Sequence, residues 1–103
     1  MLNPNQPHPG KVLLENFIKP LRISYTQLSK ELHVPVNRVS GLVDGSRNIT
    51  TDTALRLARY FGNRPEEWMT WQMGFDLAEA RKPKGLEERI KAEVKTRASS
   101  EQI

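Results

Sequence analysis

Side chains that can recognise the edges of DNA bases gather in one short segment, residues 36–41. Asparagine can form paired hydrogen bonds with adenine, arginine can pair with guanine or a phosphate, and valine can contact a thymine methyl group. The candidate base-reading residues are Val36, Asn37, Arg38, Ser40 and Gly41. Gly41 has no side chain, so readout at that position is absent or passes to Ser40 or Arg38. DNA shape would then carry part of the specificity.

Two further groups of polar residues flank this segment and are expected to hold the phosphate backbone. Residues 24–27 form a Ser-x-x-Gln capping box, and the amide groups at such a helix start attract phosphate. The candidate phosphate contacts are Ser24, Tyr25, Gln27, Ser46, Arg47 and Asn48. Ser24 and Gln27 also fit a purely structural role as a helix cap, and the two roles can coexist.

The segment that positions these side chains is TQLSKELHVPVNRVSGLVDGSR, residues 26–47. Two helices that cross steeply over a tight turn need a small residue where they approach, and Ser29 stands there. His33 is expected in the turn with a positive φ, a conformation in which histidine is enriched. The apolar residues expected to bury the second helix are Val34, Val39 and Leu42, and Gly45 ends it. These coinciding requirements predict a helix-turn-helix.

Helical periodicity covers most of the chain, and no strand pattern is convincing. We expect helices over about 10–19, 24–32, 36–44, 50–61, 63–80 and 86–97, with Pro20 ending the first of them. In the fifth helix the residues that share one face are Trp68, Trp71 and Phe75. This stripe fits core packing, and it also fits a dimer interface, where large aromatic residues are enriched. The chain is therefore predicted to be all-α.

Charge is distributed unevenly over the 103 residues. Residues 1–62 hold eight Lys/Arg against four Asp/Glu, residues 63–80 hold one against four, and residues 81–103 hold seven against four. The basic segments favour a polyanionic partner. With no cysteine, no signal-like or membrane-spanning stretch and no metal-ligand spacing around His8 or His33, we expect a cytoplasmic protein. No metal, cofactor, membrane partner or enzymatic activity is expected.

The chain resembles the HigA-type antitoxins, also called the VapI group, of the Cro/C1/Xre repressor class. The matching motifs are HPGKVLLENFIKPL, LSKELHVPVNRVSGLVDGSRNITTDTALRLARYFG and RPEEWMTWQMGFDLAEAR. The resemblance implies a five-helix lambda-repressor-like helix-turn-helix domain with a short C-terminal helical extension. It also implies a homodimer that binds inverted-repeat, double-stranded operator DNA in its own promoter and neutralises a small RNA-cleaving toxin. In the class, base-reading positions correspond to Val36, Asn37 and Gly41 here.

Three parts of the chain are expected: an extended arm at 1–9, a DNA-binding and dimerisation domain at 10–80, and a basic extension at 81–103. The toxin could bind an acidic patch at Glu66, Glu67, Asp76 and Glu79, which DNA would repel. The extension could instead be a toxin-binding or dimer-exchanging arm, or a solvated helix. Two other functions stay open, a stand-alone or phage-type repressor and an interaction module that has lost DNA binding.

Overall fold

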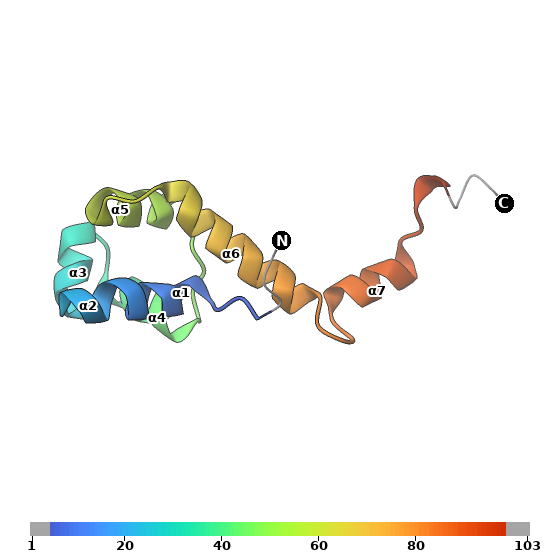
Figure 1. The fold of residues 1–103 in the computed structure, drawn as a ribbon, viewed down its shortest axis with the longest axis horizontal. Coiled ribbons are helices and arrows are strands. Elements are labelled where there is room, and N and C mark those ends of the chain that lie inside the picture. Colours follow the sequence, from blue (N-terminus) through green and yellow to red (C-terminus); the bar gives the residue numbers. More distant parts are fainter. Residues whose placement is uncertain (1–4, 99–103) are drawn as a thin grey trace.

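The computed structural model describes residues 5–98, in which helices joined by short loops are the regular elements and no strand occurs (Figure 1). The elements are α1 (Pro9–Leu13), the π-helix η1 (Leu14–Ile18), α2 (Lys19–Leu21), α3 (Tyr25–Leu32), α4 (Val36–Asp44), α5 (Thr51–Phe61), α6 (Pro65–Ala80) and α7 (Leu86–Glu93). The first three follow one another without a break. Counted as one helix, they bring the described residues to six helices, the five expected for the domain and the expected extension.

The first helix continues beyond Pro20, so the expectation that this proline ends it is wrong. The π-turn η1 changes the hydrogen-bond register directly before α2, which places Pro20 in the first turn of α2. In this turn the backbone N–H of Lys19 donates to the carbonyl of Leu14, five residues back, so the chain is already in the wider π register where Pro20, which has no N–H to donate, follows. The helix ends instead at Arg22, which adopts the left-handed conformation with φ 53°.

The core lies where α1, α3, α4, α5 and α6 converge. Its largest fully buried side chains include Trp68, Leu13, Leu28, Leu42, Leu57 and Val39. Full burial of one such apolar side chain contributes about 1.5–3 kcal/mol. Gly10 allows α1 to lie directly against α4, because a Cβ at Gly10 would stand only 1.5 Å from the carbonyl oxygen of Leu42. Packing therefore fixes α4 from its inner side.

The aromatic stripe of α6 faces the molecule's own core. Trp68 is 0% exposed, and its ring lies edge-on to Trp71, with 5.0 Å between the ring centroids. Phe75 stacks edge-on against His8 at a centroid distance of 5.0 Å. For Trp68 the expected dimer contact is contradicted, because its own chain covers the whole side chain. Trp71 and Phe75 are half-buried.

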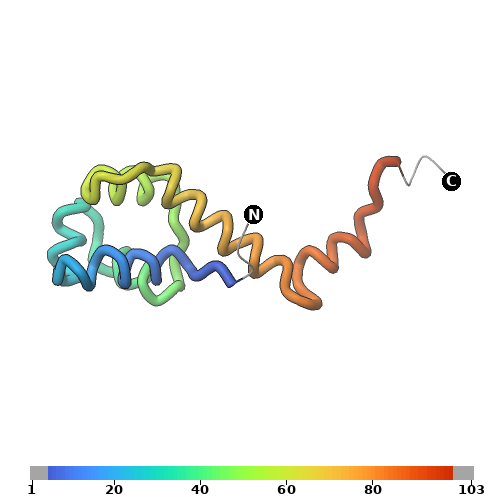
Figure 2. The backbone as a smooth tube through the Cα atoms, viewed as in Figure 1, coloured from blue at the N-terminus to red at the C-terminus, as the bar shows by residue number. Residues whose placement is uncertain are grey.

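The two ends of the described chain differ in how they relate to the domain. Residues 5–7 precede the first helix, and His8 caps it by accepting a hydrogen bond from the backbone N–H of Gly10. At the other end, α7 lies beyond the tip of α6 and leads away from the five-helix domain (Figure 2). On α7 Leu86 and Ile90 are 49% and 47% exposed, and Val94, which follows the helix in an extended conformation, is 65% exposed. α7 therefore presents an uncovered apolar stripe.

Candidate nucleic-acid interface

The turn between α3 and α4 has the predicted geometry. His33 adopts the left-handed conformation, with φ 58° and ψ 47°. Ser29 is 5% exposed, and its hydroxyl donates to the carbonyl oxygen of Thr26 over 2.7 Å, so no polar atom is stranded at the close approach. The backbone N–H of Val34 donates to the carbonyl of Ser29. α4 spans Val36–Asp44 as expected and ends at Gly45 with φ 85°.

The N-terminal half of α4 presents an exposed face. Val39 and Leu42 point into the core, at 0% and 1% exposure. Val36 is 46% exposed and Asn37 is exposed beside it, while Ser40 is half-buried one turn later. Val36 and Asn37 therefore face solvent as predicted and Ser40 does so in part, while their contact with DNA stays a prediction. An apolar group and an amide at a helix start match the requirements for contacting base edges in a major groove.

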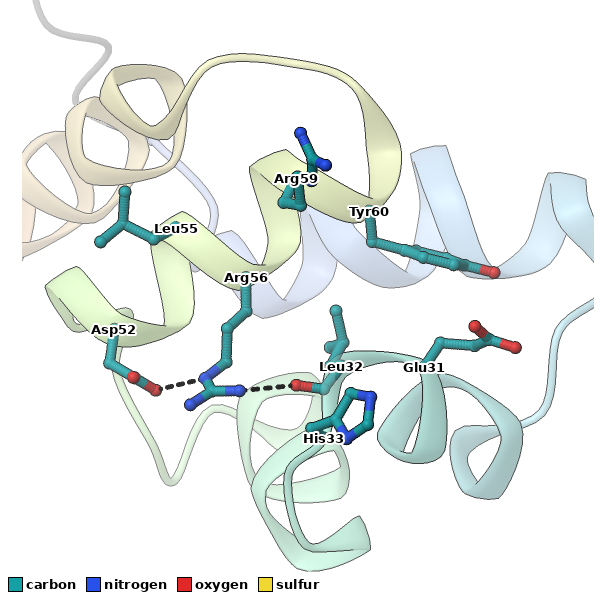
Figure 3. Close-up of a pocket in the computed structure, with 8 residues that line it drawn as sticks. All are labelled: Glu31, Leu32, His33, Asp52, Leu55, Arg56, Arg59 and Tyr60. Carbon is teal, nitrogen blue, oxygen red and sulfur yellow. Dashed lines mark hydrogen bonds and ion pairs between the residues drawn. The ribbon is translucent and has the colours of Figure 1, made fainter.

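Arg38, the fourth candidate, is already engaged within the chain. Its guanidinium donates to the Asp52 carboxylate on α5 over 2.6 Å. Asp52 also accepts from Arg56 at 2.9 Å, and Arg56 donates in turn to the carbonyl of Leu32 at 3.0 Å. Figure 3 shows this second pair of contacts at the hollow between α3 and α5. Both arginines lower the pKa of Asp52, Arg56 most strongly.

Gly41, the fifth candidate, lies on the same side of α4 as Asn37, but it is covered and not exposed as expected. It is buried because Arg47, from the following loop, lies across it. A Cβ built on Gly41 would stand 2.7 Å from the Cδ and 2.8 Å from the Cγ of Arg47. The backbone N–H of Arg47 donates to the Gly41 carbonyl over 3.0 Å, and the Ser46 hydroxyl makes a longer contact to the same oxygen. At this turn of α4 the side chain of Arg47 therefore forms the molecular surface.

The start of α3 is capped by a side chain. The Ser24 Oγ accepts a hydrogen bond from the backbone N–H of Gln27 at 3.0 Å. Ser24 and Gln27 are exposed, and Tyr25 is half-buried against the core. Exposed Ser24 and Gln27 thus mark the N-terminus of α3 at the surface, a position suited to a phosphate oxygen.

Long-range contacts anchor the loop after α4. Asn48 bonds to the ring of His8 at 3.1 Å, and the Ile49 amide donates to the buried side chain of Gln72 at 2.7 Å. Asp44 accepts from the Ser46 amide at 2.8 Å, and the Ser46 hydrogen bonds lower the pKa of Asp44. Arg47 and Asn48 are exposed within this anchored loop. The sequence reasoning missed Gln72, whose position in an apolar stretch was the available signal.

Two hollows adjoin these elements. One, of about 260 Å³, is lined by Arg38, Arg47, Asn48, Thr50 and Thr53, so two arginines and two hydroxyl residues border it. The other, of about 590 Å³, lies between α3 and α5 (Figure 3), and both acidic and basic side chains line it. The first joins the loop to α4 and is the more basic of the two. It extends the candidate interface beyond the face of α4.

Within residues 5–98, no group of three or more histidine or acidic residues is placed to hold a metal ion. Across the same residues, no helix has the length and apolar character needed to cross a membrane.

Known proteins are similar to this chain in both sequence and fold. A helix-turn-helix family model matches residues 14–68. Virulence-associated protein I of Dichelobacter nodosus is 44% identical over 77 residues, which span 75% of this chain and 71% of that protein. The HigA-family addiction module antidote protein of Coxiella burnetii superposes with a TM-score of 0.78 at 41% identity, over 88% of this chain and 97% of the other. The chain belongs to the HigA-type, or VapI, group of Cro/C1-type helix-turn-helix antitoxins.

A second HigA structure bears on the candidate interface. The Pseudomonas aeruginosa antitoxin HigA, solved with the higBA promoter, superposes with a TM-score of 0.81 at 31% identity, over 90% of this chain and 99% of that one. The HigA-type assignment covers the helix-turn-helix and α6 alike, because both the sequence match and the superpositions extend across them.

Proposed function

We propose that this HigA-type chain is an antitoxin that binds the operator of its own operon as a homodimer, represses it, and neutralises a small RNA-cleaving toxin. The observation that carries the DNA-binding part is the exposed N-terminal face of α4, with Val36 and Asn37 uncovered at its first turn. The relative solved with its promoter supports the same part. The toxin-neutralising part is supported by membership of the family alone.

In this proposal base contacts and phosphate contacts come from different elements. Val36 and Asn37 contact base edges, and Ser40 lies one turn further along the same helix. Ser24, Tyr25 and Gln27 at the start of α3 hold one phosphate, and Ser46 and Asn48 hold another, which fixes the register of α4 in the groove.

A second copy of the chain is proposed to cover the outer face of α5 and α6. Leu55, Met69 and Met73 are 55%, 39% and 50% exposed. Two shallow hollows, of about 400 and 290 Å³, meet at Pro65 and join these residues into one surface. A helix with apolar residues on two faces needs two partners, and the core supplies only one for α6. A two-fold dimer would set its recognition helices roughly 34–36 Å apart, which requires an inverted repeat.

The toxin site is proposed at α7 rather than at the acidic residues of α6. Those acids are largely engaged: Glu67 accepts from the Arg64 amide, Asp76 accepts from Gln72, and Glu79 pairs with Lys82. The stripe on α7 has no cover among the described residues, and an amphipathic helix can bind in an apolar groove of a partner.

The DNA-binding part is tested with duplexes selected by the wild-type chain from a random library and with its own promoter. Asn37→Ala should weaken binding to the selected duplex by about 1–3 kcal/mol and relax the preference at one base pair per half-site. Arg89→Ala removes one exposed positive charge from α7 and should leave that preference intact. If the wild-type chain selects no sequence, the chain is an interaction module.

The antitoxin part is tested by co-expression with the neighbouring small gene. The variants are a chain that ends at Arg81 and a charge reversal of Glu66, Glu67, Asp76 and Glu79. Loss of toxin capture on truncation, with capture retained on charge reversal, supports α7. The opposite pattern moves the toxin site to the acidic patch. If neither change affects capture, or no toxin is encoded nearby, the chain is a stand-alone repressor.

A further inference from the structure

The exposed side of α4 has one position where the helix itself supplies no side chain. Asn37 and Gly41 are four residues apart and therefore lie on the same side of the helix, one turn from each other. Asn37 offers its amide, while Gly41 offers only backbone. Arg38, the one cation of α4, is turned to Asp52 on α5. The helix thus lacks an uncommitted cation of its own.

Arg47 supplies that cation from outside the helix. Its Cγ and Cδ lie against Gly41, and its Nε would stand 3.1 Å from a Cβ at that position. The guanidinium therefore begins where a side chain of residue 41 would begin. Within residues 5–98, it makes no ion pair or side-chain hydrogen bond. Arg47 is exposed, and its backbone is fixed by the bond to the Gly41 carbonyl.

Resting on the proposed DNA-binding function, we propose that Arg47 determines sequence specificity by pairing with a guanine edge, and that Gly41 is the residue that positions it. An arginine that emerges beside the recognition side of α4 can reach the O6 and N7 atoms of guanine through two parallel hydrogen bonds. Any side chain at residue 41 would occupy the space of the Arg47 stem. Arg47 can therefore take this position only because residue 41 is glycine.

The alternative contact for Arg47 is a phosphate, and the two contacts differ in measurable ways. Loss of a phosphate contact weakens binding to all duplexes alike and lowers the salt dependence of binding by about one unit. Loss of a guanine contact removes the sequence preference at one base pair only. Lysine keeps the charge but lacks the planar fork that pairs with guanine. Arg47→Lys therefore separates the contacts.

The experiment uses full-length chains and the duplex that the wild-type chain selects from a random library. Affinities are measured for that duplex and for versions in which each G·C pair is replaced in turn. Arg47→Ala and Arg47→Lys should each weaken binding to the intact duplex about tenfold or more. For the one duplex that lacks the contacted guanine, each variant should weaken binding by less than about twofold, because the contact is already absent. Equal weakening across all duplexes by Arg47→Ala, with Arg47→Lys near wild type, overturns the proposal in favour of a phosphate contact.

The role of Gly41 is tested in two backgrounds. Gly41→Ala should abolish the preference at the same base pair when Arg47 is present and change nothing further when residue 47 is alanine. A loss of similar size in both backgrounds overturns the positioning role. Thermal unfolding checks that each variant folds, and if Gly41→Ala does not fold, the two Arg47 variants still decide the guanine contact. If the wild-type chain selects no duplex, the proposed DNA-binding function fails, a result distinct from these.

Discussion

The buried side chain of Gln72 accepts a hydrogen bond from the backbone N–H of Ile49 over 2.7 Å. Gln72 is 5% exposed, and its amide nitrogen donates to Asp76 at 2.9 Å. Because Ile49 closes the loop after α4, this contact ties the segment that carries Arg47 and Asn48 to the middle of α6. The candidate DNA-binding loop is thus held by the helix whose outer face is proposed to bind a second copy.

Gln72→Leu should lower the free energy of unfolding by about 1–3 kcal/mol, because the buried amide of Ile49 is left without an acceptor. Denaturant unfolding measures this change, and the amide hydrogen of Ile49 should exchange faster in the variant. Asp76→Asn is the control, since it retains an oxygen that accepts from Gln72. If Gln72→Leu unfolds at the wild-type denaturant concentration, the loop is not held by this bond.

The Ser24 cap allows stability to be separated from DNA binding. Ser24→Ala removes the acceptor for the Gln27 amide and should cost about 1 kcal/mol of stability. Ser24→Asp caps α3 equally well but places a negative charge where a phosphate is proposed to lie. We expect near-wild-type unfolding for Ser24→Asp together with a loss of duplex affinity of at least about tenfold. Wild-type affinity of this variant at low salt would exclude a phosphate contact at the start of α3.

Asp52 should make folding stability sensitive to acid. Its pKa lies below the ordinary value of 3.8, chiefly because Arg56 donates a hydrogen bond to it and next because Arg38 does. A carboxyl group whose pKa falls on folding stabilises the fold above its unfolded-state pKa. That contribution is lost as the pH falls through the folded-state value. Thermal unfolding between neutral pH and about pH 2 should show a shallower loss of stability for Asp52→Asn than for wild type. Parallel curves would contradict this contribution.

The local signals in the sequence located the helix-turn-helix well. The left-handed His33, the span of α4 and the glycine at its end follow from turn chemistry and short-range periodicity, which depend on neighbouring residues alone. Pro20 misled the prediction because the π-turn before it changes which amide needs an acceptor. Such a change of register leaves no pattern in the spacing of apolar residues.

The parts that sequence reasoning did not find depend on contacts between distant elements. By its type Arg38 could pair with guanine or a phosphate, whereas in the fold it pairs with Asp52 of α5. Gly41 satisfies the helical pattern for an outward position, yet a loop residue covers it. In α6 the aromatic residues suggested an interface, whereas the exposed apolar residues are Met69 and Met73. Periodicity identifies a face but does not say what covers it.

The proposed dimer surface is tested by placing a charge on it. Met73→Glu should weaken self-association by at least about 30-fold, since loss of a central interface contact costs about 2 kcal/mol or more. Met73 is 50% exposed in one chain, so the change should leave the unfolding of the monomer near wild type. Light scattering and sedimentation measure the oligomeric state, and the selected duplex measures the cost to binding.

Ile90→Glu on α7 is the matched control, because Ile90 is 47% exposed and gains the same charge. If α5 and α6 form the interface, Met73→Glu gives monomers that bind the two half-sites independently and with a steep loss of affinity for the intact repeat. Ile90→Glu then remains a dimer and affects toxin capture alone. If Ile90→Glu dissociates the dimer and Met73→Glu does not, α7 is the arm that joins two copies. The toxin must then bind elsewhere, which returns the acidic residues of α6 to consideration.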